Sequence, residues 1–209
     1  MKQRQLEILL QQVPPPEHPV PHLEQYMTPA SIAADILFTA CHWGDIEGKK
    51  VVDLGCGTGI FAVGAAYLGA EDVYGFDIDK LSIDTANNYI QSTHLPILYQ
   101  VQDVTMVNTR CDTVVMNPPF GAQKSNLNAD RPFIEKGFQI ASVIYSLHLK
   151  KTIPFIEKMI NALHGDLTLQ KTYEFPIRSQ FQFHEKQVKK FDVTLLRIET
   201  HPQQPLPQS

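Results

Sequence analysis

The chain has 209 residues, of which 43% are hydrophobic and 19% are charged, an ordinary globular composition with length for one sizeable core. Its net charge of −4 argues against a protein that binds nucleic acid tightly on its own, so any such contact must be local. The sequence contains no run long enough to span a membrane, no signal peptide and no C-x-x-C pair among its three cysteines. We therefore expect a cytoplasmic protein, also nuclear if the source is eukaryotic, with no metal site and no membrane partner.

The first part of the chain is expected to precede the main domain. Leucines at helical spacing predict an amphipathic helix over 3–13, and a proline-rich connector follows it. We assign 1–22 to this helix and connector, 23–199 to one domain, and 200–209 to a disordered tail. Thr28 and Pro29 have the residue types of an N-cap and a first helical position, which predicts a helix to about Cys41.

From Lys50 onward, strand-like and helix-like segments alternate, which predicts βαβ units and a parallel sheet. Two extended segments near the end of the chain have no helix between them, so they predict an antiparallel hairpin at the sheet edge. The expected fold is α/β, with a seven-stranded, mostly parallel sheet and helices on both faces. The predicted strands are 50–54, 72–77, 97–101, 112–116, 141–147, 166–175 and 188–199, and the predicted helices within the sheet region are 59–69, 79–91, 130–139 and 152–163.

A glycine-rich turn joins the first predicted strand to the following helix. After Asp53, the glycines Gly55, Gly57 and Gly59 form G-x-G-x-G, whereas the dinucleotide fingerprint needs its third glycine where this chain has Ile60. A pyrophosphate cradle is therefore disfavoured. The helix N-terminus remains suited to an anion such as the carboxylate of an amino-acid-like cofactor.

Acidic residues end the next two predicted strands. Asp77 ends the second strand, and its carboxylate can accept two hydroxyl hydrogen bonds from a ribose. Asp103 ends the third strand and can accept a hydrogen bond from the amino group of an adenine. Because the carboxyl ends of strands in an open sheet meet at one ligand crevice, the turn and these carboxylates predict a site for S-adenosylmethionine.

The tetrapeptide Asn117-Pro118-Pro119-Phe120 follows the fourth strand and points to methylation of a planar amino nitrogen. The lone pair of such a nitrogen is delocalised, so the nitrogen must be rehybridised before it attacks a methyl group. The side-chain carbonyl of Asn117 and the backbone carbonyl of Pro118 can accept its N–H groups and favour the tetrahedral transition state. The prolines Pro118 and Pro119 stiffen this rim, and Phe120 offers a flat face to the substrate's ring.

These motifs occur together with Leu23-Glu24-Gln25-Tyr26, Gln102-Asp103-Val104, Val143-Ile144-Tyr145-Ser146-Leu147-His148 and Phe183-His184. Over about 20–199, the combination resembles the class I S-adenosylmethionine-dependent N6-adenine methyltransferases, and among them the methyltransferase-like protein 5 family with its archaeal relatives. The resemblance implies a Rossmann-like class I methyltransferase fold and methylation of one adenosine in small-subunit ribosomal RNA.

Carried over by position, the resemblance also implies the residues of the site. Asn117 to Phe120 would hold an adenine that has been flipped out of its stack. Contacts to RNA are expected from Lys150, Phe183, His184 and Lys186. The expected cofactor-binding residues are Gln25, Tyr26, Thr28, Asp53, Gly55, Gly57, Thr58, Gly59, Ile60, Asp77, Ile78, Asp103, Val104 and Asn117.

Two partners follow from the resemblance: ribosomal RNA, and a small zinc-binding activator protein that forms a heterodimer with the enzyme and covers apolar surface. One departure from the family weakens the inference that the segment after Phe183-His184 binds RNA. The family often has a lysine-rich run after Phe183-His184, whereas this chain continues Glu185-Lys186-Gln187.

Three other functions stay open at this point. Loops of the Asn-Pro-Pro type also serve amide nitrogens, so a protein glutamine-N5 methyltransferase is an alternative, although Phe120 stands where amide methylators favour tyrosine. DNA adenine is less favoured because so short a chain has no room for a target-recognition domain. A non-catalytic assembly factor that binds the cofactor and the ribosome would have no need of an intact Asn-Pro-Pro-Phe loop.

Overall fold

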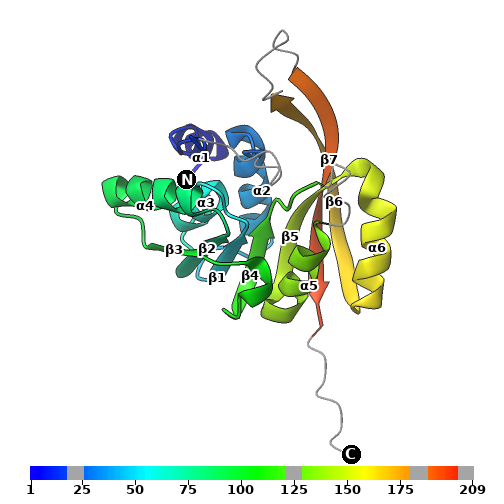
Figure 1. Ribbon diagram of the computed structural model, residues 1–209. Helices are drawn as coiled ribbons and strands as arrows, with labels where there is room; N and C mark the ends of the chain where they lie inside the picture. The colour runs from blue at the N-terminus through cyan, green and yellow to red at the C-terminus, as the bar shows by residue number, and fades with distance from the viewer. Residues whose placement is uncertain (18–25, 121–128, 179–187, 202–209) are drawn as a thin grey trace, which may run out of the picture.

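The computed structural model describes residues 1–17, 26–120, 129–178 and 188–201. Its centre is one seven-stranded sheet with the strand order β3-β2-β1-β4-β5-β7-β6 (Figure 1). Neighbours from β3 to β5 pair in parallel, and β7 pairs antiparallel with both β5 and β6. The predicted fold is confirmed. The strands are β1 Lys50–Leu54, β2 Asp72–Asp77, β3 Ile97–Val101, β4 Cys111–Met116, β5 Ala141–Leu149, β6 Gly165–Arg178 and β7 Val188–Thr200.

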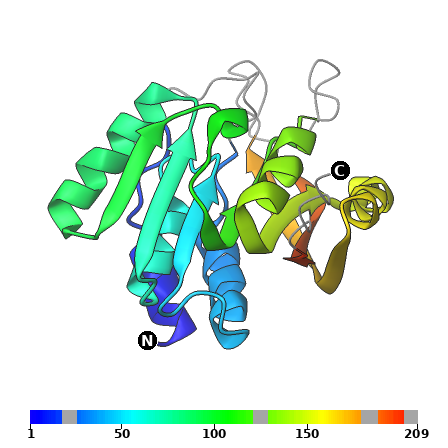
Figure 2. The same cartoon turned by 90° about the horizontal axis from the view of Figure 1, so that it is seen from below.

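Helices cover both faces of the sheet (Figures 1 and 2). One buried cluster contains residues of α1, α2, α3 and α4 together with Val115 of β4. A second contains residues of α5 and α6 together with the neighbouring Val114. Successive strand residues point to opposite faces, so an unbroken β-branched run such as this one supplies both cores. The helices are α1 Gln3–Leu10, α2 Ala30–His42, α3 Ile60–Tyr67, α4 Lys80–Thr93, α5 Arg131–Ile140 and α6 Ile153–Ala162, with 3₁₀ turns at Val104–Met106 and Lys150–Thr152.

The N-terminal helix is part of the main core. Leu6 and Leu10 of α1 are fully buried in the same cluster as residues of α2 and α3. The helix ends at Leu10, three residues before the predicted end. None of the helices in the described part of the chain is long and apolar enough to cross a membrane.

The start of α2 differs from the prediction. Pro29 occupies the N-cap position, the helix begins at Ala30, and no side chain caps it. The prediction that Thr28 caps this helix was wrong, because its hydroxyl accepts a hydrogen bond from the side chain of Asn117 instead. A tertiary contact has taken the oxygen that local capping would use.

The hairpin of β6 and β7 extends past the rest of the sheet as a two-stranded arm. β5 ends at Leu149, which pairs with Val193, so residues 188–192 of β7 pair with β6 alone. Because β5 runs parallel to β4, the arm leaves the sheet at the edge where the parallel strands end (Figure 1). The same edge is where an open α/β sheet places its ligand crevice.

A buried polar network ties the hairpin to the sheet. Arg197 of β7 donates to Asp45 Oδ2 at 2.8 Å, and the hydroxyl of Tyr145 on β5 donates to the same oxygen at 2.7 Å. The guanidinium also lies over the ring of Trp43, 4.3 Å from its centroid. These contacts hold β7 against β5 without touching the ligand edge.

Candidate active site

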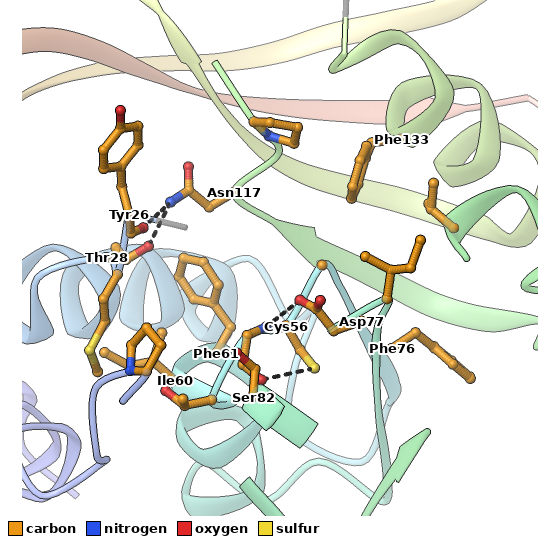
Figure 3. Close-up of a pocket in the computed structure, with 18 of the residues that line it drawn as sticks. Tyr26, Thr28, Cys56, Ile60, Phe61, Phe76, Asp77, Ser82, Asn117 and Phe133 are labelled. Atoms are coloured by element: carbon orange, nitrogen blue, oxygen red, sulfur yellow. Dashed lines mark hydrogen bonds between the residues drawn. The ribbon is translucent and has the colours of Figure 1, made fainter. Parts of the chain in front are cut away.

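A cavity of about 290 Å³ lies at the carboxyl ends of the parallel strands (Figure 3). Its walls come from the segment before α2, the β1–α3 turn, the ends of β2 and β3, the residues after β4 and the start of α5. Of the predicted cofactor-binding residues, the cavity brings together Tyr26, Thr28, Gly55, Gly57, Thr58, Ile60, Asp77, Ile78, Asp103, Val104 and Asn117.

Asp77 faces this cavity from the end of β2. Its Oδ2 accepts a hydrogen bond from the backbone N–H of Gly57, and its Oδ1 accepts one from Asp79, both at 2.8 Å. A carboxylate has about four lone-pair directions, and the backbone bonds do not use all of them, so an acceptor position remains for a hydroxyl group of a ligand. Burial raises the pKa of Asp77 and outweighs the opposing effect of the backbone hydrogen bonds from Asp79, Gly57 and Ile78.

Asp103 begins the 3₁₀ turn after β3 and also lines the cavity. Its Oδ1 accepts hydrogen bonds from both the backbone N–H and the hydroxyl of Thr105, at 2.8 and 2.6 Å. These bonds lower the pKa of Asp103. The carboxylate is therefore held ionised and oriented, as an acceptor for an amino group needs to be.

Asn117 has its amide group oriented by the segment before α2. The Nδ2 group donates to the backbone carbonyl of Tyr26 at 3.2 Å and to the hydroxyl of Thr28 at 3.1 Å (Figure 3). The carbonyl of Tyr26 only accepts, so the NH2 end must face it and Oδ1 must point the other way. Oδ1 is buried and has no hydrogen-bond partner among the described residues. A buried acceptor without a partner costs about 1–3 kcal/mol, which a ligand N–H could recover.

The other residues of the Asn-Pro-Pro-Phe loop have different positions. Pro119 lines the cavity, whereas Pro118 is buried outside it. Phe120 is only 6% exposed and does not line the cavity. Its ring stacks near Tyr26, with centroids 6.3 Å apart, and meets the edge of Phe175 at 5.8 Å. Phe120 thus supports the wall residue Tyr26, and its stacking on a substrate ring stays a prediction.

Two predicted cofactor residues lie outside the cavity. Asp53 is 1% exposed, and its Oδ2 accepts the backbone N–H of Ala62 in the first turn of α3 at 3.0 Å. Burial raises the pKa of Asp53 to about 8. Gly59 forms the N-cap of α3 with φ +91°, and a Cβ there would collide with the hydroxyl of Tyr99. Both residues shape the turn rather than face the ligand.

The predicted RNA-binding residues are mostly beyond the described part of the chain. Phe183, His184 and Lys186 lie outside the described residues, and so does Gln25, which was predicted to bind the cofactor. Lys150 is exposed at the end of β5, and its Nζ pairs with Asp192 of the arm at 3.3 Å.

Several wall residues escaped the sequence analysis, and Phe133 is the most informative of them. Phe133 approaches from α5, and a Cβ on Gly55 would lie 2.8 Å from its ring (Figure 3). Gly55 therefore needs both its positive φ and its missing side chain. No sequence signal marks this contact because α5 reaches the turn only in the folded chain. The other unpredicted wall residues are Pro16, Met27, Phe61, Phe76, Ser82, Gln102 and Ala129, and Cys56 also lines the cavity, as its place in the turn predicts.

Comparison with known proteins places the chain in a family. The family model for ribosomal protein L11 methyltransferase (PrmA) matches residues 38–118. The crystal structure of the protein PH1948 from Pyrococcus horikoshii superposes with a TM-score of 0.88 and 37% identity, covering 96% of this chain and 98% of that one.

Two curated relatives align over nearly their whole length. The rRNA N(6)-adenosine-methyltransferase METTL5 of Danio rerio is 36% identical over 95% of this chain and 99% of its own. The corresponding Drosophila melanogaster enzyme is 35% identical over 95% of this chain and 97% of its own. At this identity and coverage, the chain belongs to the METTL5 family of rRNA N(6)-adenosine-methyltransferases.

Proposed function

We propose that this protein transfers the methyl group of S-adenosylmethionine to the N6 amino group of an adenosine in small-subunit ribosomal RNA. The observation that carries the proposal is the buried Oδ1 of Asn117, an acceptor held in place at the wall of the cavity. The bound cofactor supplies an electrophilic methyl group on a sulfonium.

The cavity suits this cofactor. The turn at Gly55 and Gly57 lets the backbone approach a ligand closely, and the carboxylate of Asp77 can accept the ribose hydroxyls. Asp103 can accept the adenine amino group, while Ile78 and Phe133 offer apolar surface to the ring. These residues would hold the cofactor at the strand ends, next to Asn117.

Asn117 provides the chemistry that an adenine amino group needs. Its Oδ1 can accept an N–H of that group. The backbone carbonyl of Pro118 is the proposed second acceptor, and because Pro118 does not line the cavity here, that carbonyl would have to turn toward the bound base. Two such bonds favour a tetrahedral nitrogen whose lone pair is directed at the methyl group. The methylated nitrogen is positively charged and loses its proton readily, so transfer requires no fixed general base.

The arm of β6 and β7 supports an extended acceptor such as RNA. It rises from the sheet at the cavity edge, and its Phe175 contacts Phe120 behind the cavity wall. Lys150 lies at its base. The arm could therefore contact a polynucleotide whose target base enters the cavity, with phosphates supplying local attraction despite the net charge of −4.

The free edge of the sheet supports a protein partner. β3 is an edge strand whose side chains Leu98 and Val101 are each 50% exposed, and Met106 in the following 3₁₀ turn is 63% exposed. An edge strand with apolar side chains is a template for pairing with another chain. We propose that the small zinc-binding activator protein covers this edge and adds the basic surface that the chain itself lacks.

A transfer assay tests the reaction. Radiolabelled S-adenosylmethionine is incubated with the protein and, in parallel, with total RNA, ribosomal proteins and DNA. Label recovered as N6-methyladenosine in small-subunit ribosomal RNA supports the proposal, and label in a glutamine side chain would replace it with amide methylation. Asn117→Ala serves as the catalytic control, because losing one oriented acceptor should lower kcat about 10²–10³-fold.

Co-purification tests the partner. Leu98→Glu places a charge on the β3 edge, whereas Phe155→Glu places one on an exposed apolar residue of α6, at the other end of the sheet order. Only Leu98→Glu should abolish co-elution with the co-expressed activator. Equal retention of the activator by both variants would place its docking surface elsewhere.

A further inference from the structure

Three side chains form a buried hydrogen-bonded chain between β5 and the start of α5. Ser146 Oγ lies 2.7 Å from His148 Nε2, and His148 Nδ1 lies 3.2 Å from Asp130 Oδ2. Ser146 is fully buried and His148 is 1% exposed. In the neutral tautomer that satisfies all three, Nδ1–H donates to Asp130, and the serine hydroxyl donates to Nε2.

Serine, histidine and aspartate are hydrogen-bonded here in the same order as in a hydrolase triad, but the serine cannot act as a nucleophile. Ser146 pairs with Met116 of β4 inside the sheet, so no substrate reaches its hydroxyl. Its proton is also committed to His148 in the tautomer above. The chain of bonds therefore has to be explained by what it connects.

Asp130 connects this series of hydrogen bonds to α5. It occupies the N-cap position of α5, where an aspartate normally accepts a backbone N–H, yet its side chain makes no capping bond. It accepts from His148 instead. The start of α5 is consequently hydrogen-bonded to β5, and the side-chain cap that Asp130 could have given α5 is absent.

The residues flanking Asp130 are walls of the cavity. Ala129 precedes it, and Phe133 follows three positions later, packed against the turn at Gly55. At the other end of the chain of bonds, Ser146 lies beside Met116, which directly precedes Asn117. The buried hydrogen bonds thus run from Ser146, beside the end of β4, to the start of α5, where Ala129 and Phe133 form a wall of the cavity (the α5 wall).

We propose that His148 is a positioning residue, which sets the α5 wall against the β1–α3 turn and thereby determines cofactor affinity. The inference rests on the proposed binding of S-adenosylmethionine in this cavity. His148 does not line the cavity, so it would touch neither the cofactor nor the acceptor base, and it acts through Asp130. Its loss should therefore change the affinity for the cofactor more than the stability of the fold.

Calorimetric titration of the full-length protein with S-adenosylmethionine tests this role. His148→Phe keeps a ring but removes both nitrogens, and we expect the Kd to rise at least tenfold. His148→Asn keeps a donor at the position of Nδ1, and its Kd should stay within threefold of wild type. Tyr145→Phe is the matched control, because it breaks a buried hydrogen bond on the opposite face of the same strand and should leave Kd within twofold.

The outcomes separate cleanly. An unchanged Kd in His148→Phe, or a rise in Tyr145→Phe matching that in His148→Phe at equal loss of Tm, would overturn the positioning role. If His148→Phe does not fold, Ser146→Ala breaks the same chain more gently and should raise Kd about threefold, and an unchanged value there would count equally against the role. An unchanged Kd in Asp77→Asn would instead refute the assignment of the cavity to the cofactor.

Discussion

Nδ2 of Asn117 donates a hydrogen bond to the hydroxyl of Thr28 at 3.1 Å, joining residues 89 positions apart in the chain. The contact makes the segment before α2 part of the active site. It holds the amide so that its oxygen is directed away from Thr28, and this oxygen has no hydrogen-bond partner among the described residues (Figure 3). Orientation of this kind, established before the substrate arrives, is the main source of electrostatic catalysis.

Removing the hydroxyl of Thr28 should therefore impair catalysis without removing the catalytic residue. Among the described residues, Thr28→Val leaves the Asn117 amide group with the carbonyl of Tyr26 as its only acceptor. We therefore expect kcat to fall about tenfold, as for the loss of one hydrogen bond of about 1–1.5 kcal/mol. Thr28→Ser retains the hydroxyl and is the control. Steady-state kinetics with saturating cofactor measures both, and equal kcat values for the two variants would contradict the orienting role.

Asp77→Asn should weaken cofactor binding. The amide has one oxygen where the carboxylate has two, and its NH2 group would face the backbone N–H of Gly57 or Asp79. We expect Kd for S-adenosylmethionine to rise between tenfold and a hundredfold by calorimetry, corresponding to about 1.4–2.7 kcal/mol. Asp72→Asn changes an exposed carboxylate at the other end of the same strand and should leave Kd unaltered.

Asp53 should make the protein less stable as pH rises. In the unfolded chain this carboxyl ionises near its ordinary pKa of 3.8, whereas burial in the folded protein raises the pKa to about 8. The stabilising contribution is thus fully present below about pH 4 and is lost progressively as pH rises to about 8. The buried carboxyl of Asp77 shifts in the same direction.

Asp53→Asn tests this dependence, because the amide keeps an acceptor for Ala62 but does not ionise. The unfolding free energy of the variant relative to wild type should increase with pH by at most about 1.4 kcal/mol per unit between about pH 4 and 8. Urea unfolding without cofactor at several pH values gives this difference. A difference independent of pH would mean that Asp53 is already ionised in the folded protein.

Gly59→Ala should destabilise the fold more than Gly57→Ala. Both glycines have positive φ, which costs a residue with a side chain about 1–2 kcal/mol. Only at Gly59 does the added methyl group also collide with a neighbour, the ring of Tyr99, while Gly57 has open space. Overpacking adds about 1–3 kcal/mol. Chemical denaturation of the cofactor-free variants measures the gap, and equal losses would show that the Tyr99 ring gives way without cost.

Sequence patterns alone located most of the sheet. The alternation of short strand-like segments with helix-like segments placed β1, β2 and β3 at their observed limits, because the pattern of a short strand is local. The longer extent of β5 and β6 was missed. Residues past Leu147 and Phe175 continue as strand only because β7 pairs with them.

The residues of the site likewise fall into those that the sequence identified and those whose role only the folded structure decided. The glycine turn and the strand-end carboxylate of Asp77 were identifiable because strand topology sends all such ends to one edge. The sequence did not distinguish Asp77 from Asp53, since an aspartate near the carboxyl end of a strand is equally suited to a ligand or to a helix N-terminus. The approach of Ala62 decided between the two, and it left Asp53 to hold α3.

By itself, the sequence determined the α/β topology, the turn and the Asn-Pro-Pro-Phe loop, because each depends on residues close together in the chain. The tertiary structure alone decided that the Nδ2 end of the Asn117 amide faces Tyr26 and Thr28, that Phe120 stacks near Tyr26, and that Phe133 lines the cavity from α5. The physical reason is that these contacts join segments far apart in sequence, and side-chain direction across such distances is set by packing rather than by local propensity.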